Sequence, residues 1–405
     1  MPSLYVHVPF CIKKCDYCAF YSIPLQPSRV KTYLESLRVE INSRQKDASE
    51  GVSSLFIGGG TPTALNEEEL DAFLGMLKQG FDFGARNEWT SEQNSRKGAI
   101  QRNGAIEQTI EQTIEGNPGT LTLNKLYLMR KHGINRISLG AQAFKDSLLR
   151  QLGRIHTVAD IQDAVRLVRE AGFKNLNLDL MFGLPGQSLV DWQKTLEEVL
   201  RLKPEHLSVY GLMVEEDTPL ALNRKRIHHL PNDDAQAEMY DYAREVLGRE
   251  GYRHYETSNF ALPGYECQHN LGYWKGVDYL GLGPGAVSFM KDRPGTTGYR
   301  RWKNIEDLTQ YVQKLDQSLQ PIDPEEDEYL TERERMAERI ILGLRLADGI
   351  NLETFKMEFG RNLQDIYPSV LERYLKAGVF QFKGKVLQMK PDYWFVANSV
   401  LQEFV

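Results

Sequence analysis

Residues 4–20 read LYVHVPFCIKKCDYCAF, a short apolar run followed by three closely spaced cysteines. The run Leu4–Pro9 predicts a buried β-strand. Cys11, Cys15 and Cys18 then follow with the spacing C-x3-C-x2-C. In a large enzyme without other paired cysteines, such a cluster indicates metal binding or catalysis before it indicates disulfides.

Thiolates are soft ligands that suit iron–sulfur clusters and zinc. Three cysteines on one loop can hold three corners of a 4Fe-4S cluster and leave the fourth iron open to the amine and carboxylate of an amino acid. A closed zinc site would need a fourth ligand. His7 lies in the predicted strand and Cys267 is far along the chain. The spacing favours the cluster, with zinc and unligated thiols as alternatives.

Strand and helix patterns alternate beyond this loop. The predicted strands are Leu4–Pro9, Ser53–Ile57, Thr113–Glu115, Arg136–Leu139, Asn175–Phe182 and His206–Leu212. The predicted helices are Arg29–Asn42, Glu67–Lys78, Leu123–Lys131, Ala159–Ala171 and Leu189–Leu202. Strand–helix units in series imply parallel strands joined by right-handed crossovers. We therefore expect an α/β fold, a partial (β/α)6 TIM-like barrel that stays open.

Distinctive motifs follow these strands. GGGTP follows the second strand, EGNP the third, GAQ the fourth and GLPG the fifth. Ligands of such barrels bind at the C-terminal ends of the strands. The recurrence of motifs at one end predicts the ligand site there, although a lone glycine triplet is as often only a tight turn.

The chain divides into three predicted parts. Residues 1–250 form the barrel, with a polar surface insertion at 83–109 that we expect to be partly disordered. Residues 251–330 are rich in glycine and aromatic residues and predict a region that covers the barrel mouth. Residues 331–405 predict a winged-helix-like module with helices at Glu334–Leu346, Leu352–Phe359 and Leu363–Ala377 and a hairpin around Lys383–Gly384.

Composition excludes several classes of protein. The 405 residues are 41% hydrophobic and 26% charged, with a formal net charge of −6. This balance is that of a soluble globular protein and argues against nucleic acid as a partner. The N-terminus carries no secretory signal, and no apolar run is long enough to span a bilayer. We expect a cytoplasmic protein without an integral membrane segment.

Taken together, YVHVPFCIKKCDYCAF, GGGTPT, EGNPGT, SLGAQ, LDLMFGLPGQ and HNLGYW resemble the radical S-adenosylmethionine superfamily, and within it the HemN/HemW branch. The resemblance implies a 4Fe-4S cluster on Cys11, Cys15 and Cys18 that reduces and cleaves S-adenosylmethionine. By residue-by-residue matching, it also implies an S-adenosylmethionine pocket formed by Tyr5, Tyr17, Gly59, Gly60, Thr61, Glu115, Gln142, Arg154 and Asp179. Taken singly, each of these is as often a structural or solvated residue.

Three features favour the haem chaperones of this branch over its oxygen-independent coproporphyrinogen III oxidases. Phe20 stands where the oxidases carry a further cysteine, only ten residues precede Cys11, and CQHNLGYW resembles a haem-linked element. That element implies His269, Cys267, Tyr273 and Trp274 as haem contacts; the alternative is an aromatic loop with a hydrogen-bonded histidine. Val287 stands where such chaperones often have histidine.

The resemblance therefore implies a chaperone that binds haem and delivers it to acceptor proteins. An electron donor such as flavodoxin or ferredoxin would reduce the cluster. The alternatives are an enzyme of porphyrin biosynthesis that decarboxylates coproporphyrinogen III, and a radical enzyme with an unrelated substrate. Enzymatic activity itself stays open at this point.

Overall fold

A single twelve-stranded sheet organises most of the chain, with seven parallel strands at its centre. The computed structural model describes residues 1–84, 110–292 and 298–405, and the backbone of 99–102 and 105–108. The parallel strands run in the order β13-β1-β4-β7-β8-β9-β10. Their bounds are β13 Tyr279–Leu282, β1 Ser3–Val8, β4 Ser54–Gly59, β7 Glu111–Gly116, β8 Arg136–Gln142, β9 Leu176–Phe182 and β10 His206–Gly211. The six predicted strands are all present, and β13 is a seventh.

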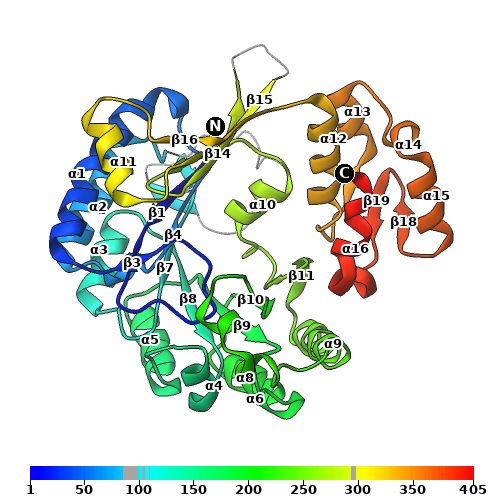
Figure 1. The fold of residues 1–405 in the computed structure, drawn as a ribbon, viewed down its shortest axis with the longest axis horizontal. Helices are drawn as coiled ribbons and strands as arrows, with labels where there is room; N and C mark the ends of the chain where they lie inside the picture. The colour runs from blue at the N-terminus through cyan, green and yellow to red at the C-terminus, as the bar shows by residue number, and fades with distance from the viewer. Residues whose placement is uncertain (85–98, 103–104, 109, 293–297) are drawn as a thin grey trace.

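Helices follow the strands and cover the outside of the curved sheet, on the left and lower sides of Figure 1. They are α1 Pro27–Arg44, α2 Glu67–Gly80, α3 Leu123–Lys131, α4 Asp146–Gln151, α5 Val158–Glu170 and α6 Leu189–Arg201. Asn66, Thr157 and Ser188 begin α2, α5 and α6 with capping boxes. Each box satisfies helix N–H groups that would otherwise lack partners, which fixes where the helix begins.

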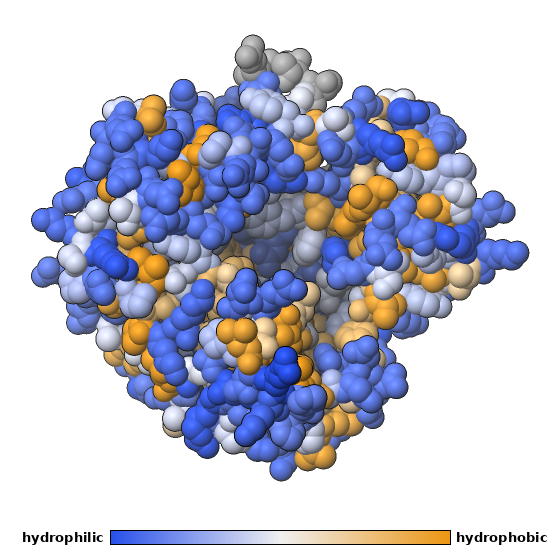
Figure 2. Space-filling model, in the orientation of Figure 1, coloured by the Kyte–Doolittle hydropathy of each residue, from blue (hydrophilic) through white to orange (hydrophobic). Residues whose placement is uncertain are grey.

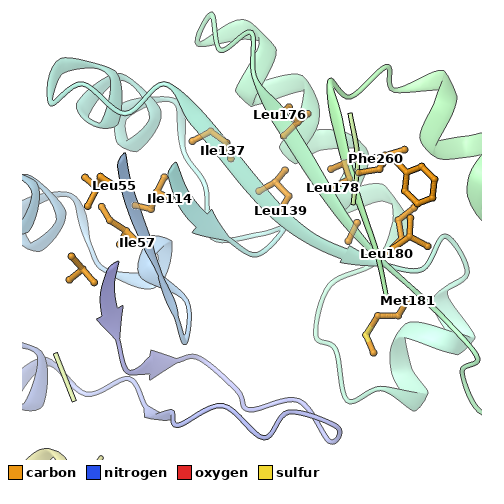
Figure 3. Packing of buried hydrophobic residues seen from close by; sticks show 14 of the residues in the cluster. Leu55, Ile57, Ile114, Ile137, Leu139, Leu176, Leu178, Leu180, Met181 and Phe260 are labelled. Carbon is orange, nitrogen blue, oxygen red and sulfur yellow. The ribbon is translucent and has the colours of Figure 1, made fainter. Parts of the chain in front are cut away.

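The parallel strands alternate between apolar and polar side chains. Leu55, Ile57, Ile114, Ile137, Leu139, Leu176, Leu178 and Leu180 form the buried apolar set, part of which Figure 3 shows. Each such side chain contributes about 1.5–3 kcal/mol by burial. The intervening side chains on β9, Asn177 and Asp179, hydrogen-bond to each other and to Ser138 of β8. The inner face of the barrel is therefore polar.

Residues 251–330 do not form a covering loop, contrary to the expectation from their composition. They contain β11 Arg253–Glu256, β12 Asn259–Ala261, α10 Gln268–Trp274, β13, β14 Val287–Lys291, β15 Tyr299–Asn304, α11 Leu308–Asp316 and β16 Ile322–Leu330. β12 and β11 extend the sheet beyond β10, whereas β14, β15 and β16 extend it beyond β13. Because most of these strands are only three to six residues long, their periodicity was too short to predict them.

The C-terminal residues form a compact module on the right of Figure 1. Its elements are α12 Glu332–Gly343, β17 Ile350–Asn351, α13 Leu352–Phe359, α14 Leu363–Ile366, α15 Pro368–Lys376, β18 Phe380–Lys383, β19 Val386–Met389, η4 Pro391–Val396, α16 Ala397–Leu401 and η5 Gln402–Phe404. The predicted helix Leu363–Ala377 is interrupted before Pro368, since a proline lacks the N–H that would continue α14. The predicted hairpin is β18–β19.

The remaining elements lie between these parts. β2 Phe10–Cys11, β3 Ile23–Pro24, η1 Gln45–Ala48 and η2 Pro62–Ala64 flank the first two strands, and α7 Pro219–Leu222, α8 Arg224–Ile227 and α9 Asp233–Arg249 follow β10. Of the polar insertion predicted at 83–109, the structure describes a backbone ladder between β5 Ala99–Arg102 and β6 Ala105–Gln108. The predicted disorder falls on residues outside the described part of the chain.

Candidate functional site

The cysteine loop lies at the C-terminal end of β1 and is held there by backbone hydrogen bonds. Cys11 ends β2, and its carbonyl accepts a bond from Leu25 at 2.9 Å. The N–H of Cys18 donates to the carbonyl of Cys15 at 3.2 Å, which makes a turn between them. All three thiols are partly exposed. The loop therefore presents them towards one end of the barrel.

Asp16 fastens the middle of the loop to two neighbouring segments. Its N–H donates to Leu152 at 3.0 Å, and its carbonyl accepts from Leu220 of α7 at 2.8 Å. Its carboxylate pairs with Arg226 of α8 at 2.5 Å. These contacts bring the loops after β8 and β10 against the cysteines, so that three segments distant in sequence surround one site.

The glycine triplet after β4 lets this strand end pass beneath the cysteine loop. A Cβ at Gly60 would lie 2.6 Å from the carbonyl oxygen of Phe10, and a Cβ at Gly59, where φ is +104°, would lie 2.6 Å from the His7 ring. The N–H of Thr61 donates to Phe10 at 2.7 Å, and its Oγ1 lies 3.6 Å from Cys11 Sγ. Close backbone packing is thus what demands glycine here. The predicted contacts of Gly59, Gly60 and Thr61 with S-adenosylmethionine stay predictions.

Glu115 and Asp179 bring two carboxyl groups to the inner face of the barrel. Glu115 Oε2 accepts a bond from the N–H of Gly59 at 3.2 Å. Burial, and secondarily the charge of Asp179, raise the pKa of Glu115 to about 8. Burial also raises the pKa of Asp179, although Asn177 donates to it at 2.7 Å. Such groups suit an ammonium group or ribose hydroxyls, because a cation or a donor would stabilise their ionised forms.

The guanidinium of Arg154 hydrogen-bonds to other groups of the protein. Its Nη2 donates to Asn117 Oδ1 at 2.6 Å and to the carbonyl of Gly140 at 2.5 Å, whereas its Nη1 donates to Cys15 Sγ at 3.3 Å. Gln142, also predicted for the pocket, is buried and adopts a left-handed φ of +66° beside them. The structure thus joins Arg154 to the cysteine loop and places Gln142 beside Gly140.

Asn117 belongs to this group, although the sequence analysis did not single it out. Its Nδ2 donates to Thr61 Oγ1 at 2.8 Å while its Oδ1 accepts from Arg154. A narrow cleft beside Cys15 is lined by these three side chains and by Ile12 and His156, among others. The motif EGNP already contained the signal, since an asparagine that follows a strand end supplies both a donor and an acceptor.

The two predicted tyrosines lie at different depths. Tyr5 lies midway along β1, where its hydroxyl is 3.0 Å from His7 Nδ1 and its ring stacks on Phe56. Tyr17 lies between Cys15 and Cys18, and burial raises its pKa. Tyr17 is therefore beside the thiols, whereas Tyr5 faces the inside of the barrel.

CQHNLGYW lies at the opposite end of the barrel from the cysteine loop. It forms α10, and the N–H of His269 donates to Glu111, the first residue of β7, at 3.2 Å. The Cys267 thiol donates to the same carboxylate at 3.3 Å. Burial, and then the nearby Glu111, raise the pKa of Cys267 to about 12. The helix therefore closes the N-terminal ends of the strands.

Both ring nitrogens of His269 have partners. Nδ1 lies 2.9 Å from Ser54 Oγ, and Nε2 lies 3.1 Å from the Tyr273 hydroxyl. Burial, and then the charge of Arg136, lower the pKa of this histidine to about 3. Both nitrogens are thus used within the protein, and the haem-ligand role expected of His269 stays a prediction.

The other expected haem contacts share this environment. Cys267 is buried, and Tyr273 packs edge-on against Tyr279 at 4.6 Å. Trp274 lies under the guanidinium of Arg345, at 5.8 Å, and so faces the C-terminal module. Val287 begins β14, which runs antiparallel to β13 from the cysteine end of the barrel. The two positions associated with haem are therefore at opposite ends of the strands.

The thiols fit a 4Fe-4S cluster in their chemistry and placement. The described residues contain no group of three or more histidine, cysteine, aspartate or glutamate side chains arranged to hold a single metal ion. In a cluster each thiolate binds a different iron, so the sulfurs need not converge on one point. Arg154 beside Cys15 would also offset the negative charge of thiolates.

Comparison with known proteins agrees with this site. Residues 5–199 match the Radical SAM superfamily, and residues 330–396 match the HemN C-terminal domain. The heme chaperone HemW of Bacillus subtilis is 33% identical over 407 residues, which cover 100% of this chain and 99% of the relative. The chain belongs to the HemW family of radical S-adenosylmethionine proteins. The HemW of Lactococcus lactis is 31% identical and covers 100% of the chain and 97% of the relative.

A solved structure extends the comparison to the whole fold. Coproporphyrinogen III oxidase (HemN) from Escherichia coli matches with a TM-score of 0.81 at 25% identity, over 100% of this chain and 90% of that one. The radical SAM fold and the family's cofactors, a 4Fe-4S cluster and S-adenosylmethionine, follow from this membership. No helix in the described parts of this HemW-family chain has the length and apolar character needed to cross a bilayer.

Proposed function

We propose that this chain is a haem chaperone that binds haem and transfers it to acceptor proteins. The observation that carries the proposal is the similarity along the entire chain to proteins named heme chaperone HemW. The absence of a cysteine at Phe20 also favours this reading over the oxidases. We place the protein in the cytoplasm, because free thiols and an oxygen-sensitive cluster suit a reducing compartment.

Cys11, Cys15 and Cys18 would hold the cluster, with S-adenosylmethionine beside it. When bound, the reduced cluster supplies the electron for cleavage of the sulfonium. Glu115 and Asp179 would accept bonds from the ammonium or ribose of the cofactor, with Gln142 and the main chain at Gly59 and Gly60 nearby. Thr61, Tyr5 and Tyr17 complete the proposed pocket, and Figure 2 shows that the molecule is hollowed at the centre of this view.

Haem would lie at the cysteine end of the barrel. Five large apolar side chains there are 53–77% exposed: Ile12, Phe20, Ile155, Met213 and Leu222. They come from the cysteine loop and from the two loops that Asp16 ties to it. A set of exposed apolar side chains at one end of a molecule indicates a binding surface. The exposed Lys13 and Lys14 of the same loop would pair with the haem propionates.

Anaerobic hemin titration tests this proposal. We expect a Soret shift in the parent protein, and weaker binding in Phe20→Ser combined with Leu222→Ser. Met357→Ser is the matched control, since Met357 is 79% exposed on the C-terminal module. No hemin binding by the parent would refute the chaperone function. An unchanged affinity in the double variant would refute only the placement of haem.

Transfer requires partners that the titration does not reveal. A small redox protein such as flavodoxin or ferredoxin would reduce the cluster, and haem-dependent apoproteins would receive the haem. Mixing the haem-loaded chain with a haem-free acceptor should move the Soret band to the acceptor, and retention of all haem on the chain would contradict the proposal.

A second function is favoured by the structural match to coproporphyrinogen III oxidase. The same site could decarboxylate coproporphyrinogen III by radical chemistry. Incubation of the reconstituted protein with coproporphyrinogen III, S-adenosylmethionine and a reductant separates the two functions. Formation of protoporphyrinogen IX would replace the chaperone function with this enzymatic one.

A further inference from the structure

Arg154 is a cation in direct contact with a cysteine of the proposed cluster loop. Its Nη1 donates to Cys15 Sγ at 3.3 Å, and this bond joins residues 139 positions apart in sequence. Other cations near the sulfurs make different contacts: Lys13 and Lys14 are exposed, and Arg226 pairs with the Asp16 carboxylate within the loop. Among the residues that the structure describes, Arg154 alone directs a charged donor at a cysteine sulfur.

The orientation of this guanidinium is fixed from its other side. Nη2 is held by Asn117 Oδ1 at 2.6 Å and by the carbonyl of Gly140 at 2.5 Å. A Cβ at Gly140 would lie 3.0 Å from Nη2, so a larger residue there would require the guanidinium to shift. A planar guanidinium that is held by two acceptors keeps its remaining N–H donors pointed in one direction. The neighbours of Arg154 therefore fix the direction of its bond to Cys15.

Two properties set the reduction potential of an iron–sulfur cluster in a given protein environment: nearby charge and hydrogen bonds to the sulfurs. Reduction adds one electron, so the reduced cluster is more negative than the oxidised one. A cation that also donates to a ligand sulfur stabilises the reduced form more than the oxidised form.

We propose that Arg154 is a positioning residue that raises the reduction potential of the cluster through its bond to Cys15. This inference rests on the proposed cluster and adds a residue that sets its reduction potential. The sequence instead led us to expect that Arg154 pairs with the carboxylate of S-adenosylmethionine. The effect of Arg154 on the reduction potential differs from that role, because it is present before S-adenosylmethionine binds. Arg154 thereby makes the cluster reducible by a weaker electron donor.

Reductive titration of the reconstituted full chain with dithionite, without S-adenosylmethionine, tests this. The electron enters from dithionite, and EPR of the reduced cluster reports the midpoint potential. Arg154→Met should lower the equilibrium constant for one-electron reduction at least tenfold, which is 59 mV. Arg29→Met is the matched control: it removes the same charge from an exposed side chain at the start of α1 and should change that constant less than about twofold.

Iron and sulfide contents separate the possible failures. A parent protein without a cluster would refute the proposed cofactor site itself. A parent-like potential in an Arg154→Met protein that holds four irons would overturn only this inference. Arg154→Gln keeps a donor but loses the charge, and should shift the potential in the same direction. Loss of the cluster from both Arg154 variants, with retention in Arg29→Met, would overturn the tuning role and make Arg154 a structural requirement of the loop.

Discussion

Replacing His269 with alanine separates a structural histidine from a haem ligand. The substitution removes two hydrogen bonds, to Ser54 Oγ and to the Tyr273 hydroxyl, from a site where the histidine is 1% exposed. Each lost bond costs about 1 kcal/mol. The cavity left by the ring adds about 2 kcal/mol. We therefore expect the free energy of unfolding to fall by about 4 kcal/mol.

Urea unfolding of the anaerobic protein, followed by circular dichroism, measures this change. The midpoint should fall while the dependence on denaturant stays the same, because the buried surface is otherwise unaltered. His228→Ala is the control, since this exposed histidine should contribute less than about 0.5 kcal/mol. Hemin affinity should stay within a factor of about two. Loss of hemin binding with parent-like unfolding would refute the reasoning and restore His269 as a ligand.

Three further predictions concern the cysteine end of the barrel. Cys15→Ser should abolish most of the iron and sulfide incorporated on reconstitution, whereas Cys267→Ser should retain both; equal contents would contradict the assignment of the cluster. Gly60→Ala should also reduce cluster content, because its Cβ would lie 2.6 Å from the carbonyl oxygen of Phe10, and a full complement of iron would show that the loop can shift. Glu115 has a pKa raised to about 8 in the folded protein, so the folded state holds a proton that the unfolded state releases above about pH 4.5. Without cofactor, stability should therefore fall by about 1.4 kcal/mol per pH unit between roughly pH 5 and 8. This slope should be smaller in Glu115→Gln, and an identical slope in both proteins would assign it to other groups.

Local signals in the sequence were sufficient for most of the barrel. The helix α3 was predicted with its observed bounds, Leu123–Lys131, because Gly133 marks its end. Strands such as β9 were predicted from their apolar runs, but an apolar run does not show which of its faces carries polar side chains. Asn177 and Asp179 occupy the inner face of β9, so the polar barrel interior depends on the side-chain alternation within the strand.

Long-range contacts account for what the sequence analysis missed. The Arg154–Cys15 bond joins distant segments, and no local pattern specifies such a partner. His269 was assigned to haem because its motif resembles a haem-linked element. Its actual environment depends on Ser54, which is 215 residues away. The burial and the partners of a lone histidine are tertiary properties, which the motif alone does not show.

The position of β1 has a consequence for how the protein is made. β1 lies between β4 and β13, and Ser3 is paired with Tyr279. On the ribosome, one edge of β1 stays bare until β13 emerges, roughly 10–45 s after β4 at about 5–20 residues per second. The thiols therefore leave the ribosome well before β13, which pairs with the second edge of β1. A cluster inserted before that pairing would lie beside an incomplete sheet, so metal loading belongs after β13 has joined β1.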